Sequence, residues 1–292
     1  MSPHGDRLPA HEGTGTRDKV QRVTPTLPYF TPPSLPPNRG VPVPLGLSHR
    51  GFSPTGLENT MAAFEAAVAL GFGYLETDVR TTSDGVLMAF HDDTLDRVTD
   101  ASGPISALSL RELRGVRVCG TEPIPTLEEV LVRWPDVRLN VDIKDAAGSA
   151  ALAALIEKHQ AHDRVLVTSF SDTRRLDCLR RLSRPAASSA GSFGTAAVVL
   201  LSPLGLSRFL ARLGRFQAVQ VPVRFRGLPV VRPAFVRRCH EAGIQVHVWT
   251  VNERPRMETL LDLGVDGLVS DSADMLAEVL SGRGAWPQGS GA

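Results

Sequence analysis

The sequence predicts an α/β fold, a (β/α)8 barrel of the TIM type with a small β-hairpin inserted after its second strand. Short β-branched runs alternate with Ala- and Leu-rich stretches from Pro42 onward, which is typical of parallel βα units. Eight such runs can be counted, and 292 residues are enough for a barrel that commonly takes about 250. Polar clusters follow several of the runs, and functional side chains of such barrels lie at strand ends.

The eight runs give the expected strands in chain order. They are 44–48, 73–79, 138–143, 164–169, 185–190, 216–221, 244–251 and 265–270. Helices with apolar residues at helical spacing are expected between most of them, at 57–70, 126–133, 149–159, 173–182, 233–241 and 255–263. This alternation predicts that the strands close into one parallel barrel.

A ninth extended run, 86–91, is expected to be the inserted hairpin strand. Only the turn-like residues 82–85 separate it from the second strand, whereas parallel neighbours need a connection of about a dozen residues. The Asp84-Gly85 pair is a hairpin signal. The run should therefore fold back antiparallel and bring His91 beside Glu76 and Asp78. The polar stretch 93–125 then forms an excursion above the barrel mouth.

The ends of the chain are expected to lie outside the barrel. Residues 1–40 are rich in Pro, Thr and Gly and lack the apolar density that offsets ordering entropy, so we predict a disordered Pro-rich tail. The barrel domain is expected at 41–282 and a flexible C-terminal tail at 283–292.

Composition and charge limit the class of protein. The net charge of +1, with both signs interspersed, gives no electrostatic footprint for nucleic acid or for an anionic membrane surface. No signal-peptide pattern and no transmembrane segment of about 18 apolar residues is found. Cys119, Cys178 and Cys239 form no C-x-x-C pair, which favours a reduced setting. We therefore expect a cytoplasmic protein.

Three carboxylates at the ends of neighbouring strands indicate a metal site. Glu76 and Asp78 are two residues apart in a strand, so both side chains point to one face, which in a barrel is the lumen. Asp142 ends the next strand, with Asn140 and Lys144 on the same side of the pleat. Adjacent carboxylates repel, and a divalent cation is the usual way to stabilise them. Surface salt bridges are the alternative, and the matching positions on successive strands weigh against it.

Two histidines at strand ends indicate acid-base chemistry. Cleavage of a phosphodiester needs one group to remove a proton and another to protonate the departing alkoxide, and His49 and His91 can serve as that pair. Arg50 can hold a phosphate oxygen bidentately, and Lys144 adds a point charge. A single histidine at such a position is more often a structural hydrogen-bonding group, so the prediction rests on both converging at one site.

Other polar residues allow a functional and a structural interpretation. Glu58-Asn59-Thr60 opens a helix, and N-cap chemistry alone can explain it. Trp249 can contact a glycerol or alcohol group, or it can be a core residue. His247 shares its strand face and is expected to be a buried wall residue. The remaining internal histidines are expected to be solvated helix-end residues, namely His159, His162 and His240.

Taken in order, these clusters resemble the glycerophosphodiester phosphodiesterase family. The resemblance spans residues 45–280 and rests on His49-Arg50-Gly51, Glu58-Asn59-Thr60, Glu76-x-Asp78-Val79, His91-Asp92, Asn140-Val141-Asp142-Ile143-Lys144, Ser169-Phe170, Trp249-Thr250-Val251-Asn252 and Gly264-Val265-Asp266-Gly267. It implies a barrel related to that of phosphatidylinositol-specific phospholipases C. It also implies a bound Mg²⁺ or Ca²⁺, with Mn²⁺ as a further candidate, and hydrolysis of small glycerophosphodiesters to glycerol 3-phosphate and an alcohol.

The resemblance also assigns roles to individual residues. The groups it implies are the metal carboxylates Glu76, Asp78 and Asp142, the acid-base pair His49 and His91, and the substrate-contacting residues Arg50, Lys144, Glu58 and Trp249. The family usually has glutamate where this chain has Asp142, a side chain shorter by one methylene. Metal affinity and metal choice are therefore left open.

Three alternative functions use the same site. A lysophospholipase D activity on lysophospholipids is the main enzymatic rival, and a lyase that stops at a cyclic phosphate is the next. A binding barrel without turnover belongs to a different class, and only the shorter Asp142 favours it. The preferred head group and the oligomeric state are not predicted from the sequence.

Overall fold

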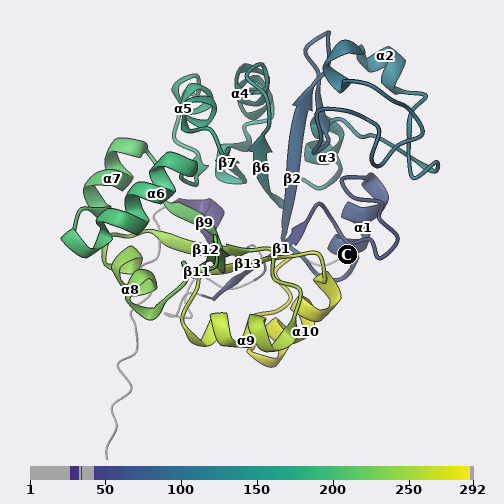
Figure 1. Cartoon of the computed structure of the whole chain (residues 1–292). Coiled ribbons are helices and arrows are strands. Elements are labelled where there is room, and N and C mark those ends of the chain that lie inside the picture. The colour runs from purple at the N-terminus through teal and green to yellow at the C-terminus, as the bar shows by residue number, and fades with distance from the viewer. Residues whose placement is uncertain (1–26, 33, 35–42, 290–292) are drawn as a thin grey trace, which may run out of the picture.

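A computed structural model describes residues 27–32, 34 and 43–289, and these residues form a barrel of eight parallel strands ringed by helices (Figure 1). The strands are β1 (Leu45–His49), β2 (Tyr74–Thr81), β6 (Arg138–Ile143), β7 (Val165–Thr168), β8 (Ala187–Ser188), β9 (Ala218–Pro222), β12 (Gln245–Trp249) and β13 (Gly267–Ser270). β1 pairs with both β2 and β13, and a bridge from Ser189 to Ala218 joins β8 to β9. The predicted barrel and its eight strands are confirmed.

The outer ring contains the six predicted helices and three more. Its helices are α1 (Met61–Ala69), α3 (Leu127–Arg133), α4 (Gly148–Lys158), α5 (Asp172–Arg180), α6 (Ser192–Leu201), α7 (Ser207–Gly214), α8 (Pro233–Glu241), α9 (Arg254–Asp262) and α10 (Ala273–Gly282). Sequence analysis did not find α6, α7 or α10. In α6 the apolar residues run almost without interruption, so helical spacing cannot be recognised there. No helix in the described ranges is long and apolar enough to cross a membrane.

The predicted hairpin is present as β3 (Leu87–Ala89), which pairs antiparallel with β2. Gly85 has φ +85 at the turn, a conformation that glycine adopts without steric cost. The excursion that follows is more ordered than its polar sequence predicts. It contains η2 (Ile105–Ala107), α2 (Leu110–Leu113) and the short strands β4 (Arg117–Val118) and β5 (Glu122–Pro123). Its buried apolar side chains, among them Leu95 and Leu113, form a small core of their own.

The closed end of the barrel differs from the predicted tails. Tyr29 and Phe30 of the short helix η1 (Pro28–Phe30) are buried against lumen residues, and the Tyr74 hydroxyl donates to the Tyr29 carbonyl at 2.7 Å. At the other terminus, the Gln288 amide bridges the Pro44 carbonyl and the Gly46 N–H. Residues 27–32 and 283–289 are thus packed rather than free, because a few large or hydrogen-bonding side chains outweigh a Pro- and Gly-rich composition. The rest of the predicted N-terminal tail lies outside the described residues.

Candidate active site

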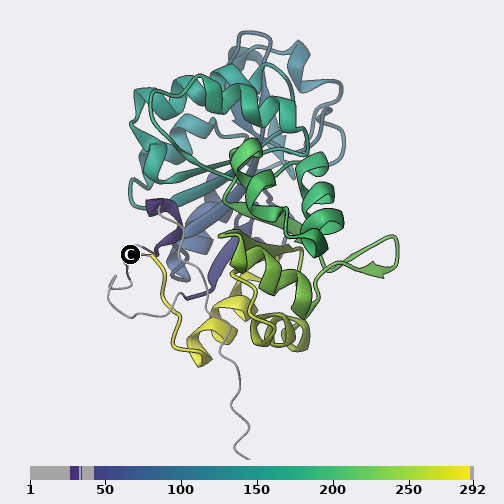
Figure 2. The ribbon, with the colours of Figure 1, turned by 90° about the vertical axis from the view of Figure 1, so that its left-hand side faces the viewer.

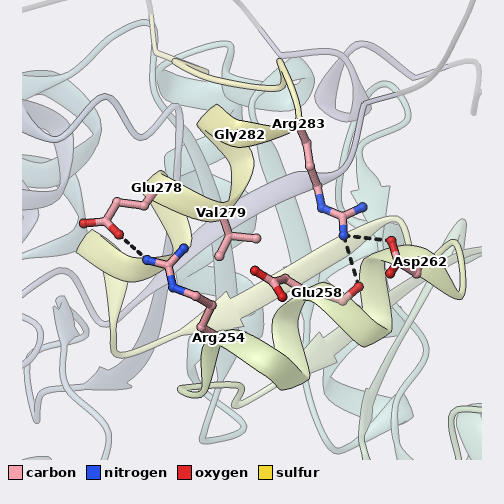
Figure 3. A pocket seen from close by; sticks show the side chains of 7 residues that line it. All are labelled: Arg254, Glu258, Asp262, Glu278, Val279, Gly282 and Arg283. Atoms are coloured by element: carbon pink, nitrogen blue, oxygen red, sulfur yellow. Dashed lines mark hydrogen bonds and ion pairs between the residues drawn. The ribbon is translucent and has the colours of Figure 1, made fainter.

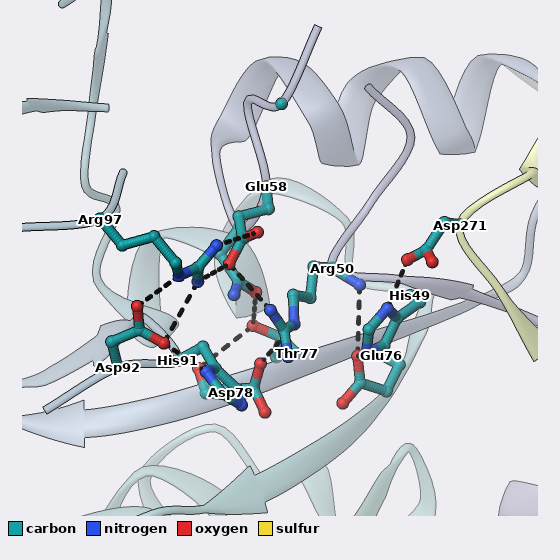
Figure 4. Close-up of polar contacts among 12 residues, drawn as sticks. His49, Arg50, Glu58, Glu76, Thr77, Asp78, His91, Asp92, Arg97 and Asp271 are labelled. Atoms are coloured by element: carbon teal, nitrogen blue, oxygen red, sulfur yellow. Dashed lines mark hydrogen bonds and ion pairs between the residues drawn. The ribbon is translucent and has the colours of Figure 1, made fainter. Parts of the chain in front are cut away.

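The polar strand ends converge at the open end of the barrel, as the register of the strands requires (Figure 4). His49 lies opposite Glu76 where β1 pairs with β2, and Asp78 lies opposite Asp142 where β2 pairs with β6. The hairpin returns β3 along β2, so the Phe90 N–H donates to the Asp78 carbonyl and His91 follows directly. Residues separated by up to 93 positions in the chain therefore share one edge of the sheet.

A tight turn after β1 places Arg50 over this edge. Arg50 has φ +54, and its backbone N–H donates to the Glu76 carbonyl at 3.0 Å. Gly51 follows with φ +83, and a Cβ there would lie only 2.7 Å from the backbone of Ala63 in α1. Only glycine permits both the dihedral and the close approach, which explains the residue type in this motif. The Asn59 N–H donates to the Arg50 carbonyl at 2.8 Å and fixes the turn from the other side.

Lys144 and Arg50 each bridge two carboxylates. The Lys144 Nζ lies 2.8 Å from Asp78 Oδ1 and 2.7 Å from Asp142 Oδ2. The Arg50 Nε lies 2.9 Å from Asp78 Oδ2, and its Nη1 lies 2.9 Å from Glu58 Oε1. Burial favours the neutral form of Asp78, but Lys144 and Arg50 outweigh it and hold its pKa below the usual range. The carboxylate of Asp78 is therefore fixed in the charged form.

The negative charges of Glu76 and Asp142 are less well balanced by nearby cations than that of Asp78. Burial, together with the negative charge of Asp78, raises the pKa of Glu76 to about 7. His49 and Arg50 partly offset this effect, and the His49 Nε2 lies 3.8 Å from Glu76 Oε2. Burial also raises the pKa of Asp142, and its Oδ1 is buried without a hydrogen-bond partner. Asn140, on the same strand face, likewise has a buried Oδ1 without a partner. Oxygen acceptors thus exceed donors at this point.

Carboxylate and amide oxygens are the ligands that a hard divalent cation prefers. Three carboxylates and an amide oxygen lie at the ends of two neighbouring strands, and two of their oxygen atoms lack a protein donor, so the residue types fit such an ion. Within the described ranges, however, no group of three or more His, Cys, Asp or Glu side chains is gathered as a metal centre, and Lys144 bridges the aspartates directly. The metal prediction stays a prediction.

Each of the two histidines is held by a carboxylate at its Nδ1. His49 Nδ1 lies 2.5 Å from Asp271 Oδ1, and His91 Nδ1 lies 2.6 Å from Asp92 Oδ1. With Nδ1 assigned as the donor, Nε2 of each ring is left for other contacts. Burial lowers the pKa of His49, but Glu76 and Asp271 outweigh that effect and raise it above the ordinary value. His91 acts electrostatically on both Asp78 and Asp142, so both rings belong to one charge cluster.

Comparison with known proteins places the chain in a family. The model of the Glycerophosphoryl diester phosphodiesterase family matches residues 49–275. A relative in Mycobacterium tuberculosis, named "Probable glycerophosphodiester phosphodiesterase 2", is 45% identical over 244 residues, which cover 83% of this chain and 92% of the relative. This chain belongs to that family. It is an enzyme of the phosphodiesterase class.

Two further similarities extend the comparison. The human protein named "Lysophospholipase D GDPD1" is 27% identical over 80% of this chain and 85% of its own length. A phosphodiesterase of Oleispira antarctica, solved in complex with the product sn-glycerol-3-phosphate, superimposes with a TM-score of 0.68 at 24% identity over 82% of this chain and 97% of that one. The second similarity confirms the barrel fold of the family.

Two residues of the polar cluster in this chain, Asp271 and Arg97, were not predicted from the sequence. Asp271 orients His49 and follows β13, so the strand-end rule could have identified it. Arg97 lies in the excursion and clamps two acids, with its Nη2 2.7 Å from Glu58 Oε1 and its Nε 2.5 Å from Asp92 Oδ2. Nothing in the local sequence marks Arg97, because its partners come from separate loops.

An aromatic pair lies beside Lys144. Trp249 contacts Phe170 edge to face at a centroid distance of 5.9 Å, and the Lys144 Nζ lies 5.4 Å from the Phe170 ring centroid. Trp249 is half-buried and packs on the buried residues of the lumen, as the core interpretation expects, and its contact with a glycerol group stays a prediction. Phe170 is largely exposed.

The remaining polar residues have structural roles. Thr60 caps α1 by accepting from the Ala63 N–H at 3.2 Å, as predicted. His162 and His240 were expected to be solvated, and this is wrong: both are buried, and His240 Nε2 lies 2.7 Å from Asp266 Oδ2. His247 is buried as predicted, and burial lowers its pKa to about 4.

A separate depression lies on the outside of the barrel between α9 and α10 (Figure 3). It is lined by Arg254, Glu258, Asp262, Glu278, Val279, Gly282 and Arg283. Arg254 pairs with Glu278, and Arg283 pairs with Asp262 at 2.8 Å. These charges neutralise one another across two packed helices, so the depression is explained by helix packing and takes no part in the site.

Proposed function

We propose that this site hydrolyses glycerophosphodiesters to glycerol 3-phosphate and an alcohol by acid-base catalysis between His49 and His91. One observation carries the proposal: two carboxylate-held imidazoles belong to the same charge cluster as Arg50 and Lys144. The combination supplies a base, an acid and two positive charges for a phosphate, which is what the reaction needs. The names of the relatives support the same reaction.

The residues divide the work as follows. Arg50 and Lys144 hold the non-bridging phosphate oxygens, in exchange for part of their contact with Asp78. One histidine removes the proton from the neighbouring glycerol hydroxyl as its oxygen attacks phosphorus, and the other gives a proton to the departing alcohol oxygen. Water then opens the cyclic phosphate with the two roles reversed. Asp271 and Asp92 keep both rings in the required tautomer and orientation.

We further propose that Glu76, Asp78 and Asp142 hold a divalent cation, with Glu58 as support through Arg50. Mg²⁺, Ca²⁺ or Mn²⁺ would supply Lewis-acid charge at a phosphate oxygen when bound. The unpartnered Asp142 Oδ1 favours this set, because a bound cation would satisfy that buried oxygen. The pKa of Glu76, which burial and the charge of Asp78 raise, favours it too, because a cation would stabilise the charged form.

A second substrate class is favoured by one comparison. The human relative is named a lysophospholipase D, and a lysophospholipid presents the same phosphodiester with an acyl chain on its glycerol. The exposed Phe170 beside Trp249 could contact such a chain. We propose the water-soluble glycerophosphodiester as the main substrate and a cytoplasmic setting, as the sequence predicts.

The test is product analysis on metal-stripped protein. Glycerophosphocholine and lysophosphatidylcholine are incubated with the EDTA-treated enzyme, and Mg²⁺, Ca²⁺ and Mn²⁺ are then added separately. We expect release of glycerol 3-phosphate and choline from the first substrate only when a cation is present. Accumulation of cyclic glycerol phosphate would show that the enzyme is a lyase and not a hydrolase. Turnover of lysophosphatidylcholine alone would favour the second substrate class, and full activity in EDTA would contradict the metal proposal.

A further inference from the structure

Charge is distributed unevenly along this chain despite its net charge of +1. Between Cys178 and His240 there are eleven arginines and no aspartate or glutamate, so the rest of the chain is net negative. We call this segment the arginine sector. It contains β8, α6, α7, β9 and the small hairpin β10–β11 (Arg224–Phe225 and Leu228–Pro229). The even mixture of charges expected from the sequence therefore does not hold in this part of the barrel.

Large apolar side chains are exposed in the same sector. On α6 and the loop after it they include Phe193, which is 82% exposed, and Leu200, which is 72% exposed. On α7 the exposed apolar residues are Phe209 and Leu213, four positions apart and so on one helix face. Soluble monomers rarely expose contiguous apolar surface of this kind unless it binds a partner.

The arginines of α7 lie beside this apolar stripe. Ser207 is buried and Leu210 is partly buried against the barrel, whereas Arg208 and Arg212 are exposed, one turn apart. The helix thus has a packed face, an exposed apolar face and an exposed basic face. A short helix with Phe and Leu next to arginines is the pattern of segments that lie in the interface of a lipid bilayer.

The β10–β11 hairpin adds a projecting tip with the same chemistry. Phe225 and Leu228 are 61% and 72% exposed, and Arg224 and Arg226 flank the first of them. Figure 2 shows the hairpin extending from the body beside the helices of the arginine sector, on the side opposite η1. The hairpin follows the carboxyl end of β9, which is the end of the barrel where the polar cluster lies.

The arginines at this surface have no acidic partner. Within the described residues, Arg224 donates to the Gly227 carbonyl, Arg226 lies over the Phe225 ring, and the exposed side chain of Arg212 forms no ion pair. Their charge is free to act on something outside the molecule. Each such arginine near an anionic lipid surface strengthens binding by about fivefold.

We propose that α6, α7 and the β10–β11 hairpin form a surface that docks on an anionic lipid layer, with Phe225 and Leu228 inserted and the arginines on the headgroups. A second copy of the chain fits less well, because a two-fold interface would bring arginines of both copies together. Residues 1–26 fit less well too, because they contain no aromatic residue and only Met1, Leu8, Val20 and Val23 as large apolar side chains. Docking turns the barrel mouth toward the lipid, and it does not depend on the hydrolysis proposed above.

Co-sedimentation with vesicles tests the proposal. The full-length protein is mixed with vesicles of phosphatidylglycerol and phosphatidylcholine in equal parts, and with vesicles of phosphatidylcholine alone. We expect binding to the anionic vesicles only, weakening as salt rises. The double variants Phe225→Ser/Leu228→Ser and Arg224→Gln/Arg226→Gln should each bind at least tenfold more weakly. Thermal unfolding of both variants should match that of the unmodified protein, which confirms that they fold.

Matched substitutions outside the sector are the controls. Val132→Ser on α3 and Arg111→Gln on α2 remove an exposed apolar and an exposed basic side chain, and both should bind as the unmodified protein does. Failure of the unmodified protein to bind anionic vesicles would overturn the proposal, as would equal binding by the hairpin variants. A dimer in light scattering that Phe225→Ser/Leu228→Ser converts to a monomer would assign the surface to a second copy instead.

Discussion

At the carboxyl ends of β1, β2 and β6, buried charges neutralise one another within hydrogen-bonding distance, whereas the arginines of α7 and of the β10–β11 hairpin lie in solvent beside exposed apolar side chains. In the first region, the Asp78 carboxylate contacts both Arg50 and Lys144. In the second, Arg212 and Arg226 contact no acid in the described residues. Buried charge is tolerated only when paired, and exposed apolar surface is retained when something outside the chain covers it. The paired charges of the first region suit the chemistry proposed for it, and the unpaired charges of the second suit the proposed contact with lipid.

Removal of one cation from each region should have a large effect in the first region and none in the second. Lys144→Met leaves Asp78 and Asp142 with less compensation and removes a phosphate contact, so we expect kcat/KM for glycerophosphocholine to fall about 10²–10³-fold. The free energy of unfolding should fall by about 3 kcal/mol. Arg212→Met should change neither quantity measurably. Steady-state kinetics and urea unfolding check both variants, and equal effects would remove the distinction between the regions.

The buried His247 of β12 should make the free energy of unfolding depend on pH. His247 lies opposite Gln220 of β9 and Gly267 of β13, fully buried, and its pKa is lowered to about 4. The unfolded chain has the ordinary pKa near 6.5 and binds more protons below it. Stability is therefore full above pH 6.5 and should fall by about 3 kcal/mol as the pH drops to 4.

Urea unfolding between pH 7 and pH 4 measures this loss. In His247→Gln the corresponding part of the slope should disappear, while His159→Gln at the end of α4 should keep it. An unchanged slope in His247→Gln would show that other groups cause the acid sensitivity.

Alanine substitution of two glycines with positive φ tests whether the backbone is more tightly constrained in the first region than in the second. Gly51→Ala forces a Cβ to 2.7 Å from the Ala63 backbone, whereas Gly227→Ala in the β10–β11 hairpin meets nothing within 4 Å. We expect the first to cost about 3 kcal/mol of unfolding free energy and the second about 1 kcal/mol, since only the left-handed dihedral is strained there. Thermal unfolding of both variants measures the difference. A larger loss for Gly227→Ala would contradict it.

Much of the fold could be predicted because its signals are local. Eight β-branched runs, the Asp84-Gly85 turn and the two-residue spacing of Glu76 and Asp78 lie within short windows of sequence. The convergence of His91 with Asp78 followed from the hairpin alone. The catalytic region was therefore accessible from strand ends and their order.

The parts that were missed depend on distant contacts. Asp271 follows a strand end, but its contact with His49 spans 222 positions, and Arg97 joins two loops, so neither contact is visible in a local pattern. Tyr29 and Gln288 pack on the closed end of the barrel from segments whose composition indicated free tails. The arginine sector was missed for another reason, since the net charge of the whole chain hides a segment without acids.

The most direct test of the central claim is the rate of glycerol 3-phosphate release by histidine variants. His49→Asn and His91→Asn are compared with His159→Asn, which alters a histidine outside the cluster, at matched melting temperatures and with the restoring cation present. We expect each of the first two to lose about 10²–10⁴-fold in kcat and the third to equal the unmodified enzyme. Retention of activity in His49→Asn or His91→Asn would contradict the assignment of the catalytic region.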